Sequence, residues 1–222
     1  IADAARVASG RGVTGIVDLD MGGNVDAWQR RIRGGLHAWR VRACLYPIDL
    51  KLARRRGLRS GDVVPHTRGL ATVGWYKLFT DGALNSRTAW CADPYPGAVA
   101  PHDHGLPTYA DDELLAAARE AADAGFEHVN LDLIYGTPGE TDTDLEASLD
   151  AVLSVPVDHV SAYALIVEDG TAFARKVRRG EVPMPDDDVL AARYERIDER
   201  LSDAGMTWYE VSNWAAAQDG SP

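Results

Sequence analysis

Apolar and polar positions alternate along the chain in two patterns, which predict strands and helices in turn. Short runs of apolar and β-branched residues predict buried strands, whereas apolar residues three or four apart predict amphipathic helices. The predicted strands span residues 13–19, 41–46, 71–79, 129–135, 160–167 and 207–211. The predicted helices span residues 2–9, 25–39, 50–56, 111–124, 141–153 and 187–204.

This order of elements predicts an α/β fold. Strand and helix alternate about five times before a proline-bounded linker at 183–185. Continuous apolar strands separated by helices indicate a parallel sheet with helices outside it, joined by right-handed crossovers. Since a complete barrel needs about eight such units, we expect a partial (β/α) TIM-type barrel with about five parallel strands and outer helices. The start of a small C-terminal α/β extension should follow it.

Composition narrows the class of protein. The chain has 45% hydrophobic and 26% charged residues, which is ordinary for a globular protein. An excess of 34 acidic over 23 basic residues gives a net charge of −11, so we expect no nucleic-acid partner. No apolar run reaches the ~18 residues of a membrane span. Cys44 and Cys91 fit no disulfide framework, which favours a reducing cytoplasm.

The first half contains a distinctive run, Tyr76-Lys-Leu-Phe-Thr-Asp-Gly82. A lysine inside a barrel strand is costly to bury as a cation. Carboxylation by CO₂ would convert Lys77 into an anionic ligand able to bridge two metal ions. Alternatively, Lys77 extends its ammonium to solvent or pairs with Asp81. Asp81 and Asp132 also form a possible polar site, because chemistry in barrels gathers at the carboxyl ends of strands. No residue is predicted to be catalytic.

With Gly12-Val-Thr-Gly-Ile-Val-Asp18, this run resembles amidohydrolase family 3 over residues 1–125. The resemblance implies metal-dependent hydrolysis of C–N bonds in amide-type substrates, with a divalent, zinc-type metal and carboxylated Lys77 as a ligand. The family's strand-borne His-X-His pair has no counterpart in this chain. One remaining ligand cannot hold a catalytic zinc, which needs about three protein ligands.

The second half carries other motifs, in the order Asn130-Leu-Asp-Leu-Ile-Tyr-Gly-Thr-Pro-Gly-Glu140, Glu168-Asp-Gly-Thr171 and Trp208-Tyr-Glu-Val-Ser-Asn-Trp214. They resemble the oxygen-independent coproporphyrinogen III oxidase-like radical SAM family, especially its heme-chaperone branch. The resemblance implies strands five and six of a radical SAM barrel and heme as a ligand. It also places Ile134, Gly136 and Pro138 on the S-adenosylmethionine side. Taken alone, these residues serve a plain strand-to-helix turn equally well.

The change of motifs near Gly125 predicts a chimera with three parts: residues 1–125, 126–182 and 183–222. The radical SAM family needs three clustered cysteines for its [4Fe–4S] centre, and this sequence has two cysteines in all. We therefore expect a hybrid fragment, inactive as it stands, that holds no cofactor. Two alternatives stay open, a heme-chaperone-like radical SAM protein and an amidohydrolase remnant that binds a metal or small ligand weakly. Whether the chain is an enzyme is not decided by its sequence.

Overall fold

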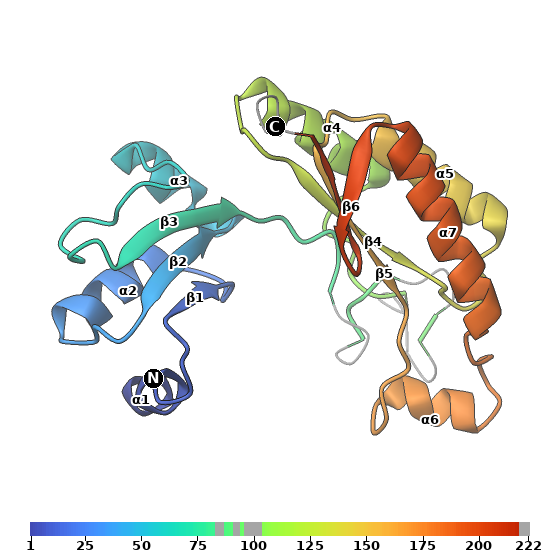
Figure 1. Cartoon of the computed structure of the whole chain (residues 1–222), viewed down its shortest axis with the longest axis horizontal. Helices are drawn as coiled ribbons and strands as arrows, with labels where there is room; N and C mark the ends of the chain where they lie inside the picture. Colours follow the sequence, from blue (N-terminus) through green and yellow to red (C-terminus); the bar gives the residue numbers. More distant parts are fainter. Residues whose placement is uncertain (83–86, 91–93, 96–103, 218–222) are drawn as a thin grey trace. The chain divides into compact units, whose positions relative to one another are not determined.

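The computed structural model describes residues 1–82, 87–90, 94–95 and 104–217, which form two compact units (Figure 1). The first unit spans Ile1–Phe79 and the second spans Thr80–Pro222. These units are defined by contacts, whereas the predicted parts are defined by family resemblance. The three-part division at 125 and 182 therefore stays a prediction.

The first unit is a three-stranded parallel sheet with helices. Its order of elements is α1 (Ala2–Ser9), β1 (Gly15–Asp18), α2 (Asn24–Arg33), β2 (Arg40–Leu45), α3 (Pro47–Arg56) and β3 (Ala71–Tyr76). The strand order is β1-β2-β3, and both pairings are parallel. The predicted helix 25–39 was too long, because Gly34 and Gly35 end α2 before Trp39. Gly35 has φ +103°, a conformation that glycine adopts without strain.

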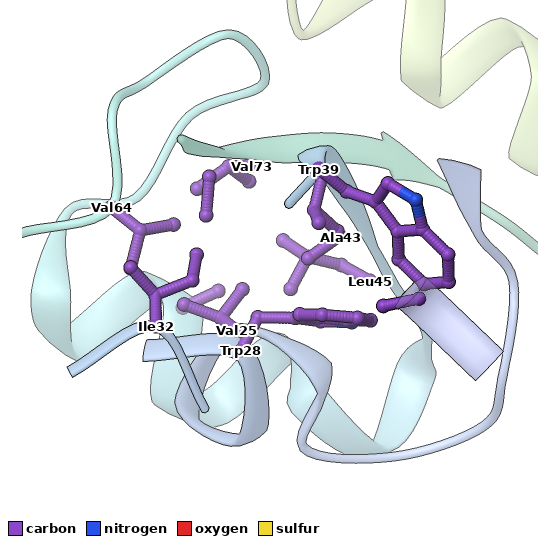
Figure 2. Close-up of a cluster of buried hydrophobic side chains, with 12 residues drawn as sticks. Val25, Trp28, Ile32, Trp39, Ala43, Leu45, Val64 and Val73 are labelled. Carbon is purple, nitrogen blue, oxygen red and sulfur yellow. The ribbon is translucent and has the colours of Figure 1, made fainter. Parts of the chain in front are cut away.

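The core of the first unit lies between α2 and the sheet. Side chains of Val25, Trp28 and Ile32 line one face of α2 and meet Ala43, Leu45 and Val73 from the strands (Figure 2). Their spacing of three and four residues is the helical pattern that the sequence shows. Trp39 packs beside Trp28, with ring centroids 6.5 Å apart. Trp39 therefore joins the predicted core from the segment before β2 and not from the helix.

The second unit contains a four-stranded mixed sheet. Its elements are α4 (Asp111–Asp123), β4 (Asn130–Tyr135), α5 (Asp142–Leu153), β5 (His159–Ala164), α6 (Ala172–Arg178), α7 (Asp187–Asp203), β6 (Met206–Glu210) and β7 (Asn213–Ala216). The strand order is β4-β5-β7-β6. Strands β4 and β5 run parallel, while β7 is antiparallel to both of its neighbours.

Helices α5 and α7 cover one face of this sheet, where the second core forms (Figure 1). Trp214 on β7 is fully buried there, together with Leu149 of α5, Val160 of β5 and Leu201 of α7. The indole N–H of Trp214 donates to Asp198 Oδ1 at 2.7 Å, which satisfies its one polar atom. None of the helices in the described part of the chain is both long and apolar enough to cross a membrane.

The coarse prediction is confirmed, since the chain is a mixed α/β protein with parallel strands and outer helices. Among the described residues the parallel strands are divided between a sheet of three strands and a mixed sheet of four, so one continuous partial barrel with about five strands stays a prediction. The sequence also missed α6 and β7. At four residues, β7 is too short to show a period of two, and Asn and Ala are weak strand formers.

Candidate functional site

The best candidate site is the face of the second sheet that lies opposite α5 and α7. Residues of β4 alternate along the strand: Leu131, Leu133 and Tyr135 pack in or against the core, whereas Asn130, Asp132 and Ile134 are exposed. In the parallel register these three exposed residues lie beside His159, Ser161 and Tyr163 of β5. Because paired residues point to the same side of a sheet, all six share one face, on which Ser161 is buried and the other five side chains are partly or largely exposed.

Five polar side chains on this face form a connected group, here called the polar row: Asn130, Asp132, His159, Ser161 and Tyr209. His159 Nδ1 lies 2.5 Å from Asn130 Oδ1, and His159 Nε2 lies 2.7 Å from the Tyr209 hydroxyl. The Asn130 amide nitrogen donates to Asp132 Oδ1 at 2.7 Å, and Ser161 Oγ lies 3.4 Å from Asn130 Oδ1. The row therefore joins β4, β5 and β6.

Both ring nitrogens of His159 bond within the polar row. The amide oxygen of Asn130 only accepts, so His159 Nδ1 donates to it. His159 Nε2 and the Tyr209 hydroxyl share the second bond, whose direction depends on the tautomer. Ser161 Oγ donates to Asn130 Oδ1, and no bond joins it to His159 among the described residues. The arrangement suits recognition of a ligand by hydrogen bonds.

The carboxyl end of the same face is apolar. Ile134 is 56% exposed and Tyr163 is 44% exposed, and they lie opposite each other in the register. Ile166, just after β5, is 71% exposed. Large apolar side chains on one face next to a polar row are typical of a ligand surface, because a ring can pack on one part while polar atoms bond to the other.

The loop after β4 adjoins this end of the face. Gly136 has φ +80°, which glycine tolerates and other residues resist. Its N–H donates to Glu140 Oε2 at 2.5 Å, so the loop closes on itself before α5 begins. Arg193 of α7 bonds to Glu140 through the side chain at 2.6 Å and through the backbone oxygen at 2.7 Å. Pro138 is exposed within this loop.

The structure places the predicted site residues in two groups. Asp132, Ile134, Gly136 and Pro138 come together on β4 and its loop, as their spacing in the sequence requires. Whether they bind S-adenosylmethionine stays a prediction. Asp81 Oδ2 accepts the backbone N–H of Trp90 at 2.8 Å, which is a structural bond within a loop. The possible polar site at Asp81 and Asp132 stays a prediction.

Lys77 lies in the first unit, directly after β3. Its backbone N–H donates to Leu45 O at 2.9 Å, and its ammonium lies 5.2 Å from the centre of the Phe79 ring. Cys44 nearby is buried, and burial raises the pKa of its thiol, which keeps the sulfur protonated. The described residues contain no group of three or more His, Cys, Asp or Glu that could hold a metal ion. A metal role for carboxylated Lys77 stays a prediction.

Four residues that the structure makes prominent are not singled out by the sequence: Asn130 and His159 in the polar row, and Glu140 and Arg193 at the loop. His159 looks isolated in the sequence because its partners lie 29 and 50 residues away. A signal was present, since polar residues occupy alternate positions in both β4 and β5. Two such strands side by side predict a shared polar face.

Comparison with solved structures supports the same general fold. The chain is similar to coproporphyrinogen III oxidase (HemN) from Escherichia coli, described as a radical SAM enzyme. The likeness has a TM-score of 0.51 and 16% identity, and covers 88% of this chain and 40% of that one. At this identity it shows the fold alone. No family model matches the chain.

Comparison with curated protein sequences gives a more specific similarity than the comparison of folds. Heme chaperone HemW from Mycobacterium tuberculosis (strain H37Rv) is 71% identical over 99 residues, which is 45% of this chain and 25% of that protein. HemW from Bacillus subtilis is 33% identical over 125 residues, covering 51% of this chain and 33% of that protein. This chain thus spans between a quarter and a third of these two relatives. Similarity to heme chaperones of the HemN-like type confirms the second of the two predicted resemblances.

Two earlier expectations need correction. The expectation of a chain without a cofactor was wrong, because the curated relatives are named as heme chaperones. The hybrid with an amidohydrolase is not supported either. The likeness to an uncharacterised metal-dependent hydrolase from Pyrococcus horikoshii has a TM-score of 0.46, too low to carry an argument.

Proposed function

We propose that this chain contributes to a heme-chaperone-like protein of the radical SAM class, which sequence analysis gave as an alternative. One observation carries the proposal, the 71% identity to a heme chaperone over 99 residues. That length is close to the segment after Gly125, which bears the Asn130–Glu140 and Trp208–Trp214 motifs. The predicted division at residues 125 and 182 belongs to this proposal. No observation favours an amidohydrolase function, so none is proposed.

Within this proposal, the open face of β4 and β5 is the S-adenosylmethionine side, and the residues present fit that ligand. Asp132 Oδ1 is held by Asn130, while no described residue bonds to Oδ2. A free carboxylate oxygen can accept hydrogen bonds from hydroxyl or ammonium groups of the ligand. Ile134 and Tyr163 offer apolar surface for a ring beside it. S-adenosylmethionine would supply a radical only on one-electron reduction by a [4Fe–4S] cluster, for which the two cysteines of this sequence are too few; the residues of this face would bind and orient it.

Heme is the second ligand of this proposal, following the relatives' name. A porphyrin has a large apolar ring system with two acidic side chains, so it needs apolar contact area more than a polar row. Ile166, 71% exposed just beyond β5, is not among the residues assigned to S-adenosylmethionine and offers apolar surface for the porphyrin. Both nitrogens of His159 already have partners, so we do not assign it as an iron ligand.

Binding measurements on this chain test the proposal. We expect saturable binding of S-adenosylmethionine by calorimetry, and a saturable change in the heme absorption spectrum. Removing the carboxylate with Asp132→Ala should weaken S-adenosylmethionine binding about tenfold or more, since it deletes a charged hydrogen-bond acceptor. Asp203→Ala, an exposed carboxylate at the end of α7, is the charge-matched control and should leave affinity unchanged. Absence of saturable binding of both ligands would refute the proposal.

A further inference from the structure

A buried ion pair connects α7 to the loop that follows β4. Arg193 and Glu140 each have side chains only 9% exposed, and Arg193 Nη1 lies 2.6 Å from Glu140 Oε2. Arg193 Nη2 also donates to the backbone oxygen of Glu140 at 2.7 Å, and Nε lies 3.3 Å from Asp142 Oδ1. All three nitrogens of the guanidinium are therefore used. A buried charge with this many partners holds them in one geometry, and losing it leaves a carboxylate buried without its partner.

The same carboxylate oxygen also holds the start of the loop. Glu140 Oε2 accepts the N–H of Gly136 at 2.5 Å, so a continuous chain of bonds runs from Arg193 through Glu140 to the first residue after β4. Leu190, one turn before Arg193 on α7, lies against the same turn. A Cβ placed on Gly136 would come within 2.2 Å of Leu190 Cδ2. Helix α7 thus fixes both the backbone direction and the packing of Gly136.

A small cavity lies between this loop and the start of α7. Its volume is about 120 Å³, and it is lined by residues 136–140 and by Pro183, Met184 and Pro185 among others. All three guanidinium nitrogens of Arg193 bond within the protein beside this cavity, so the contact between α7 and the loop acts as a brace.

We propose that Arg193 is a positioning residue for the ligand loop, so that α7 forms part of the S-adenosylmethionine site without touching the ligand. The inference rests on the proposed function, in which Gly136 lies on the cofactor side. Arginine suits the role because its planar guanidinium binds the carboxylate, the backbone oxygen and Asp142 at once. Lysine, with one ammonium on a flexible stem, cannot reproduce this set.

Amide hydrogen exchange tests the brace without any ligand. Arg193→Met should speed exchange at Gly136 by about tenfold or more, because Glu140, which accepts the Gly136 N–H, loses the guanidinium that holds it in place. Ala162, whose N–H donates to Ser212 O at 2.8 Å, serves as the internal reference and should change little. Arg196→Met is the matched control, since Arg196 also lies on α7 but pairs with Glu146 and Glu199. It should leave Gly136 exchange unchanged.

Two milder variants keep the test decisive if Arg193→Met does not fold. Arg193→Lys keeps the charge, and Glu140→Gln keeps an acceptor for Gly136 but removes the buried anion. Both should raise Gly136 exchange relative to Ala162, each by less than the full deletion. Exchange at Gly136 that rises no more than exchange at Ala162, in every variant that folds, would overturn the brace.

Affinity for S-adenosylmethionine supplies the second readout. We expect Arg193→Met to weaken binding about tenfold while Arg196→Met binds as the unaltered chain does, which a general loss of stability would not produce. Equal affinity of the unaltered chain and Arg193→Met would overturn the positioning role, even with faster exchange. If the unaltered chain does not bind S-adenosylmethionine at all, the assignment of the S-adenosylmethionine side in the proposed function fails instead. The exchange measurement then still decides whether Arg193 fixes the loop.

Discussion

Trp214 offers the sharpest test of how the second unit is held together. It belongs to the Ser-Asn-Trp part of the C-terminal motif, is fully buried, and packs on Tyr194 with ring centroids 5.6 Å apart. Its indole N–H bonds to Asp198 on α7. Trp214 therefore joins the antiparallel hairpin, the parallel strands and the last helix. We predict that Trp214→Ala destabilises the second unit more than any exposed aromatic substitution in it.

The magnitude follows from two contributions. Truncating a buried tryptophan to alanine costs about 3–5 kcal/mol through lost transfer energy and the cavity left behind. Loss of the bond to Asp198 adds about 1 kcal/mol, because that carboxylate is half-exposed and regains water. A total of about 4–6 kcal/mol is a large part of the roughly 5–15 kcal/mol that stabilises a whole domain. Trp214→Phe keeps most of the ring and should cost about 1–2 kcal/mol.

Urea unfolding followed by the NMR cross-peaks of β5 amides measures this unit separately from the first. With a slope of about 2 kcal/mol per molar urea, Trp214→Ala should lower the midpoint by about 2–3 M. Trp208→Ala is the matched control, since Trp208 lies opposite Trp214 in the hairpin register but is 50% exposed. It should shift the midpoint by less than about 0.5 M. A shift below 1 M for Trp214→Ala would refute the proposed packing of the hairpin.

Three further predictions concern charge and backbone. Arg196 and Arg200 of α7 lower the pKa of Glu146, so the stability that this carboxylate contributes is present above its unfolded pKa of 4.5 and is lost as pH falls through the lowered folded pKa. Glu146→Gln should therefore lower the free energy of unfolding by about 0.5–1 kcal/mol at pH 7 in low salt, and by progressively less as pH falls below 4.5. The bond to Asp158 raises the pKa of His128, so the stability that this pair contributes is present below pH 6.5 and is lost as pH rises through the raised pKa. NMR titration should place the His128 midpoint above 6.5, and the Asp158→Asn substitution should return it toward 6.5. Gly136→Ala should lower the free energy of unfolding, measured in urea, by about 2–3 kcal/mol, because the new Cβ would meet Leu190 in addition to the strain of a positive φ. Gly139→Ala, where φ is also positive but no atom lies within 4 Å of the new Cβ, should lower it by about 1 kcal/mol.

Much of the fold follows from patterns that act over short distances. The helical spacing of Val25, Trp28 and Ile32 predicts the face that α2 buries, and Thr141 predicts the start of α5 because its side chain accepts from the Asp144 N–H. Local patterns do not state which strands pair. Five parallel strands are compatible with one sheet or with two, and the choice depends on contacts between segments far apart in the sequence.

The candidate site shows the same limit more strongly. The loop glycines and Asp132 stand out in the sequence because they lie within a few residues of each other. His159 and Tyr209 are 50 residues apart and become neighbours only because β7 inserts between β5 and β6. Arg193 is an ordinary helical residue by its position, and its burial depends on the approach of α7 to the loop, 53 residues earlier. Hydrophobic periodicity carries no information on that approach.

The polar row helps to decide whether the second unit is an inert fragment or carries a ligand-binding site. On a solvated sheet face, exposed polar side chains gain little from bonding to one another, because water competes for each donor and acceptor. Here Asn130 uses both amide atoms and His159 uses both ring nitrogens within the row. Ordering these side chains costs conformational entropy, and hydrogen bonds between exposed groups are too weak to offset that loss. A ligand that bonds to the free oxygen of Asp132 would gain from that order, since the cost of arranging the row is met before it binds. The row and the Arg193 brace therefore agree with the heme-chaperone-like proposal better than with an inert fusion of two halves.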